Sequence, residues 1–156
     1  MNSHFTFSSA LDRQRALLKE TRHRFLCNSQ ATITVRSIVH ASWVRCLQLG
    51  IDPKRLQAED PLRSADIQAI IERSVLYEHS IATLNELLIQ TKETKVILTL
   101  SDSQGRIIFL AGDHHVQQQA EAMNFLLGSN WSEEVIGTNG IGLSLKTGYP
   151  AANFCS

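Results

Sequence analysis

The sequence has few cysteines and no long apolar run. These two features argue against a disulfide-rich secreted protein and against a membrane-spanning protein. Its 156 residues include three cysteines, Cys27, Cys46 and Cys155, at wide and irregular spacing. Without a Cys-x-x-Cys pair, we expect free thiols in a reducing compartment and no disulfide framework. The longest apolar runs, 96–100 and 107–111, are far shorter than the roughly 20 residues that cross a bilayer. The N-terminus also lacks the apolar core of a secretory signal. We therefore expect a cytoplasmic protein with no membrane partner.

The common catalytic and nucleotide-binding motifs are also absent. The glycine-rich stretch 137–142 follows no predicted strand, and it has neither Rossmann spacing nor the Gly-Lys-Ser/Thr of a Walker loop. No Gly-x-Ser-x-Gly elbow is present. Glu133 and Glu134 are neighbours at a predicted helix start, where they complement the helix dipole and point in different directions. The pair His114-His115 has no second ligand pair at metal-binding spacing, which favours a solvated loop. We expect no catalytic residues, no cofactor and no metal ion.

Charge is balanced over the whole chain but not along it. The formal net charge is +0, yet residues 1–55 hold nine Lys/Arg and three Asp/Glu, whereas residues 56–156 hold six and twelve. One interpretation is a basic arm for nucleic acid. The other is two segments that attract each other or face opposite neighbours. The second is favoured because no aromatic or glycine-rich nucleic-acid motif accompanies the basic stretch.

Apolar spacing predicts three helices in the first 90 residues. The first begins near Ser9, which is suited to cap it, and carries a basic face. The second covers about residues 32–49 and ends at Gly50. The third begins near Ser64 and continues for more than twenty residues, because its apolar residues recur at spacings of three, four and seven. A helix of that length packs beside a partner chain or forms one wall of the domain.

The second half begins with a predicted β-hairpin. Two apolar runs, 96–100 and 106–110, flank a polar turn at 102–105. A helix over 116–127 follows. From Trp131 onward the glycines predict tight backbone turns beside a short helix.

Three stretches in this order resemble one known family. The first is Ser42-Trp43-x-Arg45-Cys46 followed by Gly50-Ile51-Asp52-Pro53, the second is the hairpin, and the third is Trp131-Ser132-Glu133 followed by Gly137-Thr138-Asn139-Gly140-Ile141-Gly142. Together they cover residues 32–156. Their order and spacing resemble the N-terminal region of acetoin-catabolism-regulator-like sigma-54-dependent transcriptional activators, in which the hairpin is similar to the first two strands of a GAF sheet.

The resemblance implies an α+β fold and a regulatory function. N-terminal helices in residues 1–62 would precede a partial GAF-like antiparallel sheet in residues 63–156. The region would bind a small-molecule effector, form a homodimer and bias an ATPase that remodels sigma-54 RNA polymerase. The polymerase and DNA would be contacted only by domains absent from this chain. Trp43 and Arg45 would make interdomain or dimer contacts. The implied effector contacts are Leu98, Leu100, Phe109, Phe125, Trp131, Ile136, Thr138 and Asn139.

Two departures from the family pattern affect these expectations. Leu143 replaces a residue with a hydroxyl, which would alter the ligand chemistry if that position faced the effector. The sequence also ends at Ser156, before the family's later strands, so we expect a truncated sheet with an unpaired edge and an uncovered apolar face.

Two other functions stay open. One is a stand-alone interaction or dimerisation fragment that binds no ligand. The other is nucleic-acid binding through the basic first helix. Salt-dependent retention on DNA would support the nucleic-acid function, and thermal stabilisation by a ligand would support the sensor.

Overall fold

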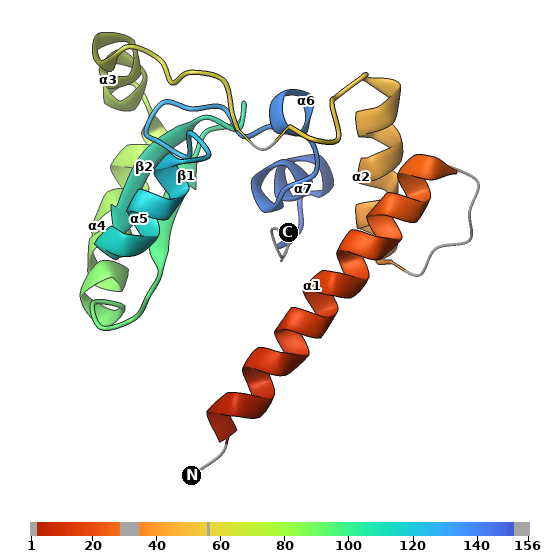
Figure 1. Ribbon diagram of the computed structural model, residues 1–156. Helices are drawn as coiled ribbons and strands as arrows, with labels where there is room; N and C mark the ends of the chain where they lie inside the picture. Colours follow the sequence, from red (N-terminus) through yellow and green to blue (C-terminus); the bar gives the residue numbers. More distant parts are fainter. Residues whose placement is uncertain (1–2, 29–34, 56, 152–156) are drawn as a thin grey trace.

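The computed structural model describes residues 3–28, 35–55 and 57–151, and this part of the chain contains N-terminal helices followed by an antiparallel β-hairpin and further helices (Figure 1). The hairpin, with the helices packed on it, forms one lobe, and the first two helices lie on the other side of α6 and α7. This arrangement confirms the predicted α+β class. The elements are α1 (Ser3–Cys27), α2 (Ser37–Gln48), α3 (Ser64–Glu72), α4 (Val75–Gln90), β1 (Ile97–Ser101), β2 (Ile107–Gly112), α5 (His114–Glu121), α6 (Glu133–Ile136) and α7 (Gly140–Thr147).

The hairpin has the predicted position and turn. β1 and β2 pair antiparallel, with Leu100 opposite Phe109 and a bulge between Leu100 and Ser101. The Asp102 carboxylate closes the turn by accepting hydrogen bonds from the backbone N–H groups of Gln104 (2.8 Å) and Arg106 (2.9 Å). α4 contacts both strands, and α3 and α5 contact β2.

The single long helix predicted after Ser64 is wrong, because the chain forms two helices that meet at Ser74. Ser74 has an extended backbone (φ −85°, ψ 102°), and its hydroxyl accepts a hydrogen bond from the Tyr77 backbone N–H at 3.1 Å. A serine side chain satisfies an unpaired amide at a helix start better than it stabilises a helix interior. The apolar spacing continues through this break, which is why the spacing alone predicted an unbroken helix.

Replacing Ser74 with alanine should lower the free energy of unfolding by about 1 kcal/mol, because the Tyr77 amide loses its capping acceptor. Urea denaturation would measure the difference. Ser74→Asn is the matched control, since asparagine caps helices as well as serine does. Equal destabilisation of both variants would contradict the capping role.

Several helix ends differ from the predicted ones. α1 begins at Ser3, earlier than Ser9, and α2 begins at Ser37; residues 32–34 of its predicted start lie outside the described residues. His114 and His115 are exposed as expected, but they begin α5 instead of lying in a loop, because Asp113 caps that helix. α5 ends at Glu121, short of the predicted 127, and Asn124 beyond it adopts a positive φ of 56°.

Two apolar clusters hold the chain together. The helical cluster consists of Phe25, Val39, Trp43 and Leu143, and it joins α1 and α2 to α7. The sheet cluster centres on Ala58, Ile107 and Trp131, with Phe125 and Ile136 packed against it. Leu143 is fully buried in the helical cluster. The apolar side chain at this departure from the family pattern therefore contributes to packing between α7 and the N-terminal helices.

Candidate functional site

The loop between Trp131 and Gly142 is organised by the buried side chain of Asn139. Its Nδ2 donates to the carbonyl oxygens of Trp131 and Gly137, both at 2.9 Å, and its Oδ1 accepts from the Gly142 backbone N–H at 2.9 Å. Asn139 is also the N-cap residue of α7. One amide therefore fixes the loop at three points. This loop presents Glu133 and Thr138 to α2.

Glu133 forms a two-point ion pair with Arg45 of α2. Arg45 Nε donates to Oε2 and Arg45 Nη2 donates to Oε1, each at 2.9 Å. The Glu133 side chain is only 1% exposed, whereas that of Arg45 is 36% exposed. A buried carboxylate is stable only when it is paired and hydrogen-bonded. The pair therefore couples the position of α2 to the start of α6.

Neighbouring Glu134 lies in a different environment. It points outward and pairs with Lys146 of α7, and both side chains are nearly half exposed. The hydrogen bond from the Lys146 ammonium group lowers the pKa of Glu134 below its usual value. Because the pKa is lower in the folded state, the pair stabilises the fold fully when the pH is above the pKa of the unfolded state. This contribution is lost as the pH falls through the pKa of the folded state. The two glutamates thus point in different directions, as predicted.

A second polar contact lies one turn along α2. The Ser42 and Thr138 hydroxyl oxygens are 2.6 Å apart, and the Cys46 thiol sulfur lies 3.7 Å from the Thr138 hydroxyl. Ser42 is fully buried. These contacts and the Arg45–Glu133 pair attach the same face of α2 to both ends of α6. We call this set, Ser42, Arg45, Glu133 and Thr138, the α2 junction.

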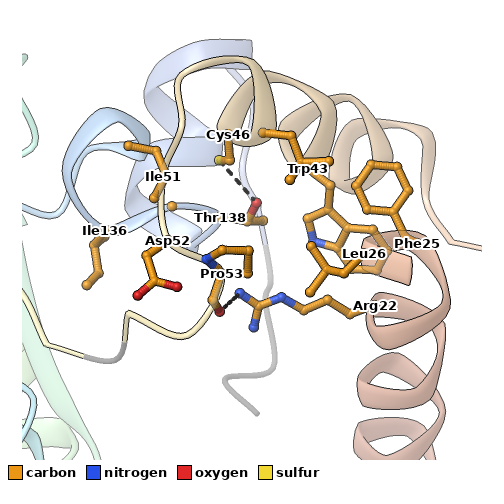
Figure 2. Close-up of a pocket in the computed structure, with 12 residues that line it drawn as sticks. Arg22, Phe25, Leu26, Trp43, Cys46, Ile51, Asp52, Pro53, Ile136 and Thr138 are labelled. Atoms are coloured by element: carbon orange, nitrogen blue, oxygen red, sulfur yellow. Dashed lines mark hydrogen bonds between the residues drawn. The ribbon is translucent and has the colours of Figure 1, made fainter. Parts of the chain in front are cut away.

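A small pocket lies beside the α2 junction (Figure 2). α1 contributes Arg22 to its wall, and the Arg22 Nη2 donates to the Pro53 carbonyl oxygen at 2.7 Å. The pocket has a cavity volume of about 30 Å³ and opens to solvent. Its lining residues are Arg22, Phe25, Leu26, Trp43, Cys46, Leu47, Ile51, Asp52, Pro53, Ile136, Gly137 and Thr138. We call it the junction pocket.

The eight residues predicted to contact an effector do not surround one pocket in the described part of the chain. Phe125, Trp131 and Ile136 belong to the sheet cluster. Ile136 and Thr138 line the junction pocket. The other four residues are Leu98 and Leu100 on β1, Phe109 on β2 and Asn139 at the start of α7.

Phe109 lines an open groove between α3, α4 and β2 with a volume of about 600 Å³. Leu98 and Leu100 are half-buried on β1. Asn139 is buried, and its amide is occupied by the three backbone hydrogen bonds described above. Trp43 packs on Phe25 of α1, with ring centroids 5.5 Å apart, and Arg45 contacts α6.

Glu133 and Ser42 were not predicted as site residues. The sequence did contain one indication of their importance. Both lie in stretches that resemble the known family, Ser42 in the first and Glu133 in the third. Their partners lie 88 and 96 residues away, and no local spacing reports a contact over that separation.

Residues 3–28, 35–55 and 57–151 contain no group of three or more His, Cys, Asp or Glu side chains that could hold a metal ion. Within the same ranges, none of the helices combines the length and apolarity needed to span a bilayer. Cys27 and Cys46 are free thiols, and Cys155 lies outside the described residues.

Comparison with known proteins gives relatives among transcriptional regulators. No protein-family model matches the chain. It is 31% identical to an uncharacterised 47.3 kDa protein in the thcA 5′ region of Rhodococcus erythropolis, over 78% of this chain and 28% of that protein. It is 29% identical to the acetoin dehydrogenase operon transcriptional activator AcoR of Bacillus subtilis, over 76% of this chain and 20% of the activator. The chain therefore spans less than a third of either relative.

A solved structure shares the fold. The match is to the crystal structure of the Escherichia coli DhaR(N)–DhaL complex, with a TM-score of 0.56 and 24% sequence identity. It covers 72% of this chain and 38% of the matched chain. The match supports the GAF-like arrangement predicted from the sequence.

Proposed function

This chain resembles the N-terminal sensory region of acetoin-catabolism-regulator-like transcriptional activators, and on that premise we propose that it is a regulatory region that senses a small effector. The observation that carries the proposal is the match of three quarters of the chain to a transcriptional activator. The activity that it controls would belong to other domains of a longer activator, including an ATPase acting on sigma-54 RNA polymerase and a DNA-binding domain.

Regulation requires a coupling free energy between the effector site and the rest of the protein. An effector shifts a conformational equilibrium only if it binds one arrangement better than the other. The α2 junction is the candidate coupling element, because it attaches the N-terminal helices to the loop that carries Trp131, Ile136 and Thr138. The effector contacts predicted from the sequence, and a homodimer, remain part of this proposal.

The proposal predicts that an effector raises the melting temperature of the chain. A ligand that binds only the folded state at one hundred times its Kd adds about 2.7 kcal/mol, which corresponds to about 5–10 °C for a chain of this size. Acetoin is the first probe to test, because two relatives are named for acetoin genes or catabolism. Related short-chain diols and ketones complete the panel.

Differential scanning fluorimetry would measure the shift as each compound is titrated. A dose-dependent rise for one compound, with no rise for its closest analogue, would support sensing. The absence of any rise across the panel would contradict it.

A protein partner is the second candidate signal. The structural neighbour was crystallised in a complex with DhaL. A partner-sensing chain would form a complex with a purified DhaL-type protein during size-exclusion chromatography without any small molecule. Nucleic-acid binding has less support, because two basic side chains of α1 are already engaged: Arg22 with Pro53 and Arg24 with Glu20. Loss of DNA retention with rising salt would revive it.

A further inference from the structure

Asn139 is the only asparagine of the chain that a glycine follows. In such a pair the backbone nitrogen of the glycine can attack the side-chain carbonyl carbon of the asparagine, because glycine has no Cβ to hinder the approach. Gly140 is the first residue of α7, and the first N–H groups of a helix have no partner within the helix. The two reactants of an intramolecular deamidation therefore lie together in the loop beside the α2 junction.

The closed loop holds the Asn139 amide in an unreactive arrangement. Asn139 is 6% exposed, and its backbone is extended, with φ −150° and ψ 170°. Its Nδ2, which would leave as ammonia, donates to the Trp131 and Gly137 carbonyl oxygens, and its Oδ1 accepts from the Gly142 N–H. Ring closure has to turn the amide carbon toward the Gly140 nitrogen, which breaks these hydrogen bonds. The reaction therefore requires an open loop.

The contacts of the α2 junction oppose that opening. Asn139 directly follows Thr138, whose hydroxyl oxygen lies 2.6 Å from that of Ser42. The Arg45–Glu133 ion pair attaches the other end of α6 to the same helix. Loss of either contact would lower the free energy needed to open the loop. The rate of deamidation should therefore depend on how firmly α2 is attached.

The reaction has two steps, and water is its co-reactant. The Gly140 nitrogen forms a bond to Asn139 Cγ, the bond from Cγ to Nδ2 breaks, and Nδ2 leaves as ammonia with the proton of the backbone nitrogen. Water then hydrolyses the cyclic imide. Hydrolysis at Cγ gives an aspartate at position 139. Hydrolysis at the backbone carbonyl carbon gives an isoaspartate, in which the main chain runs through the former side chain.

Neither product restores the closed loop. A carboxylate at position 139 places an oxygen atom where Nδ2 donated, so the contacts with the Trp131 and Gly137 carbonyl oxygens become contacts between acceptors. A buried charge without donors is strongly unfavourable. Aspartate still caps α7, whereas the lengthened main chain of isoaspartate displaces the cap as well. We propose that Asn139 is a one-way chemical switch, which deamidates when the α2 junction opens and then leaves the loop detached from α2.

Incubation of the whole chain at mildly alkaline pH would measure the reaction. Mass spectrometry of the peptide that contains residue 139 gives the extent of conversion, and an isoaspartyl methyltransferase labels the isoaspartate. We expect the folded chain to react at least about tenfold more slowly than the same chain in urea, because about 1.4 kcal/mol of opening free energy corresponds to a factor of ten.

Variants of the α2 junction test the link to α2. Arg45→Met should accelerate deamidation of the folded chain at least about tenfold, which corresponds to about 1.4 kcal/mol. Lys146→Met, which breaks the exposed pair with Glu134, should change the rate far less. Ser42→Ala is a milder variant, and loss of one neutral hydrogen bond should accelerate the reaction about fivefold. Circular dichroism would show which variants are folded.

Two substitutions in the loop test the chemistry and its consequence. Gly140→Ala should remove most of the product even in urea, because the added methyl group hinders the attacking nitrogen. Asn139→Asp reproduces one product and should unfold at a lower urea concentration than the unsubstituted chain.

The proposal is overturned if the folded chain reacts as fast as the unfolded chain, or if Arg45→Met and Ser42→Ala react no faster than Lys146→Met. It is also overturned if Asn139→Asp is as stable as the unsubstituted chain, or if Gly140→Ala deamidates normally. The inference goes beyond the proposed function, and none of these measurements involves an effector. Either one can therefore fail without the other.

Discussion

Replacing Arg45 with methionine is expected to lower the free energy of unfolding by about 3 kcal/mol, because it leaves the Glu133 carboxylate buried without its partner. Glu133 is 1% exposed, so water cannot replace the two lost hydrogen bonds without opening the junction. Methionine keeps much of the aliphatic stem, which separates the loss of charge from the loss of packing. Urea denaturation would measure the decrease in the free energy of unfolding. An unchanged m value would show that the variant changed stability and not the compactness of either state.

The adjacent ion pair provides the control. Lys146→Met breaks the pair with Glu134, whose side chain is 46% exposed, and should cost less than about 1 kcal/mol because water solvates the remaining carboxylate. Adding Glu133→Gln to Arg45→Met should recover part of the stability, giving a coupling energy of about 2 kcal/mol in a double-mutant cycle. Equal losses for Arg45→Met and Lys146→Met would show that the buried pair does not hold α2.

Gly142→Ala is expected to destabilise the chain by about 2 kcal/mol through overpacking. A Cβ atom at this position would lie 2.8 Å from Glu133 Cγ, 2.9 Å from the Glu133 backbone nitrogen and 3.2 Å from Asn139 Nδ2. The backbone nitrogen cannot move away as a flexible side chain can. The added methyl group would therefore disturb both the buried carboxylate and the amide that organises the loop. Thermal and urea unfolding would both record the loss.

Gly140 is the matched control on the same helix. Neither Gly140 nor Gly142 has a positive φ, and the nearest atom to a Cβ at Gly140 is the Ala151 carbonyl oxygen at 3.7 Å. Gly140→Ala should therefore raise stability by about 0.5 kcal/mol, because alanine reduces the conformational freedom of the unfolded chain. If both alanine variants behaved alike, the close approach of Glu133 to α7 would not be what requires glycine at position 142.

The elements that the sequence predicted well are those determined by neighbouring residues. The hairpin follows from two apolar runs and an intervening turn, in which Asp102 binds backbone amides two and four residues away. The break at Ser74 was missed for the opposite reason. Ser74 lies within an apolar spacing that continues into α4, and only its capping hydrogen bond shows that one helix ends there. The spacing of apolar residues indicates which face of a helix is apolar. It does not indicate whether that face belongs to one helix or to two successive helices.

The contacts of the α2 junction could not be predicted from local sequence patterns. Glu133 and Glu134 look equivalent in the sequence, yet one is buried against Arg45 and the other pairs with Lys146 near the surface. The glycine-rich stretch correctly predicted turns. What it could not show is that Gly142 is required by the close approach of Glu133, nine residues earlier, because that approach depends on how α6 and α7 pack.

The separation between Arg45 and Glu133 also has a consequence during protein synthesis. The two residues are 88 positions apart. At about 5–20 residues per second, a ribosome takes roughly 4–18 s to add that length. During this interval α2 has been made but its carboxylate partner and Leu143 have not, so the apolar surface around Trp43 lacks the α7 part of its cover. A chaperone that holds the N-terminal helices during this interval would therefore keep that apolar surface from binding elsewhere.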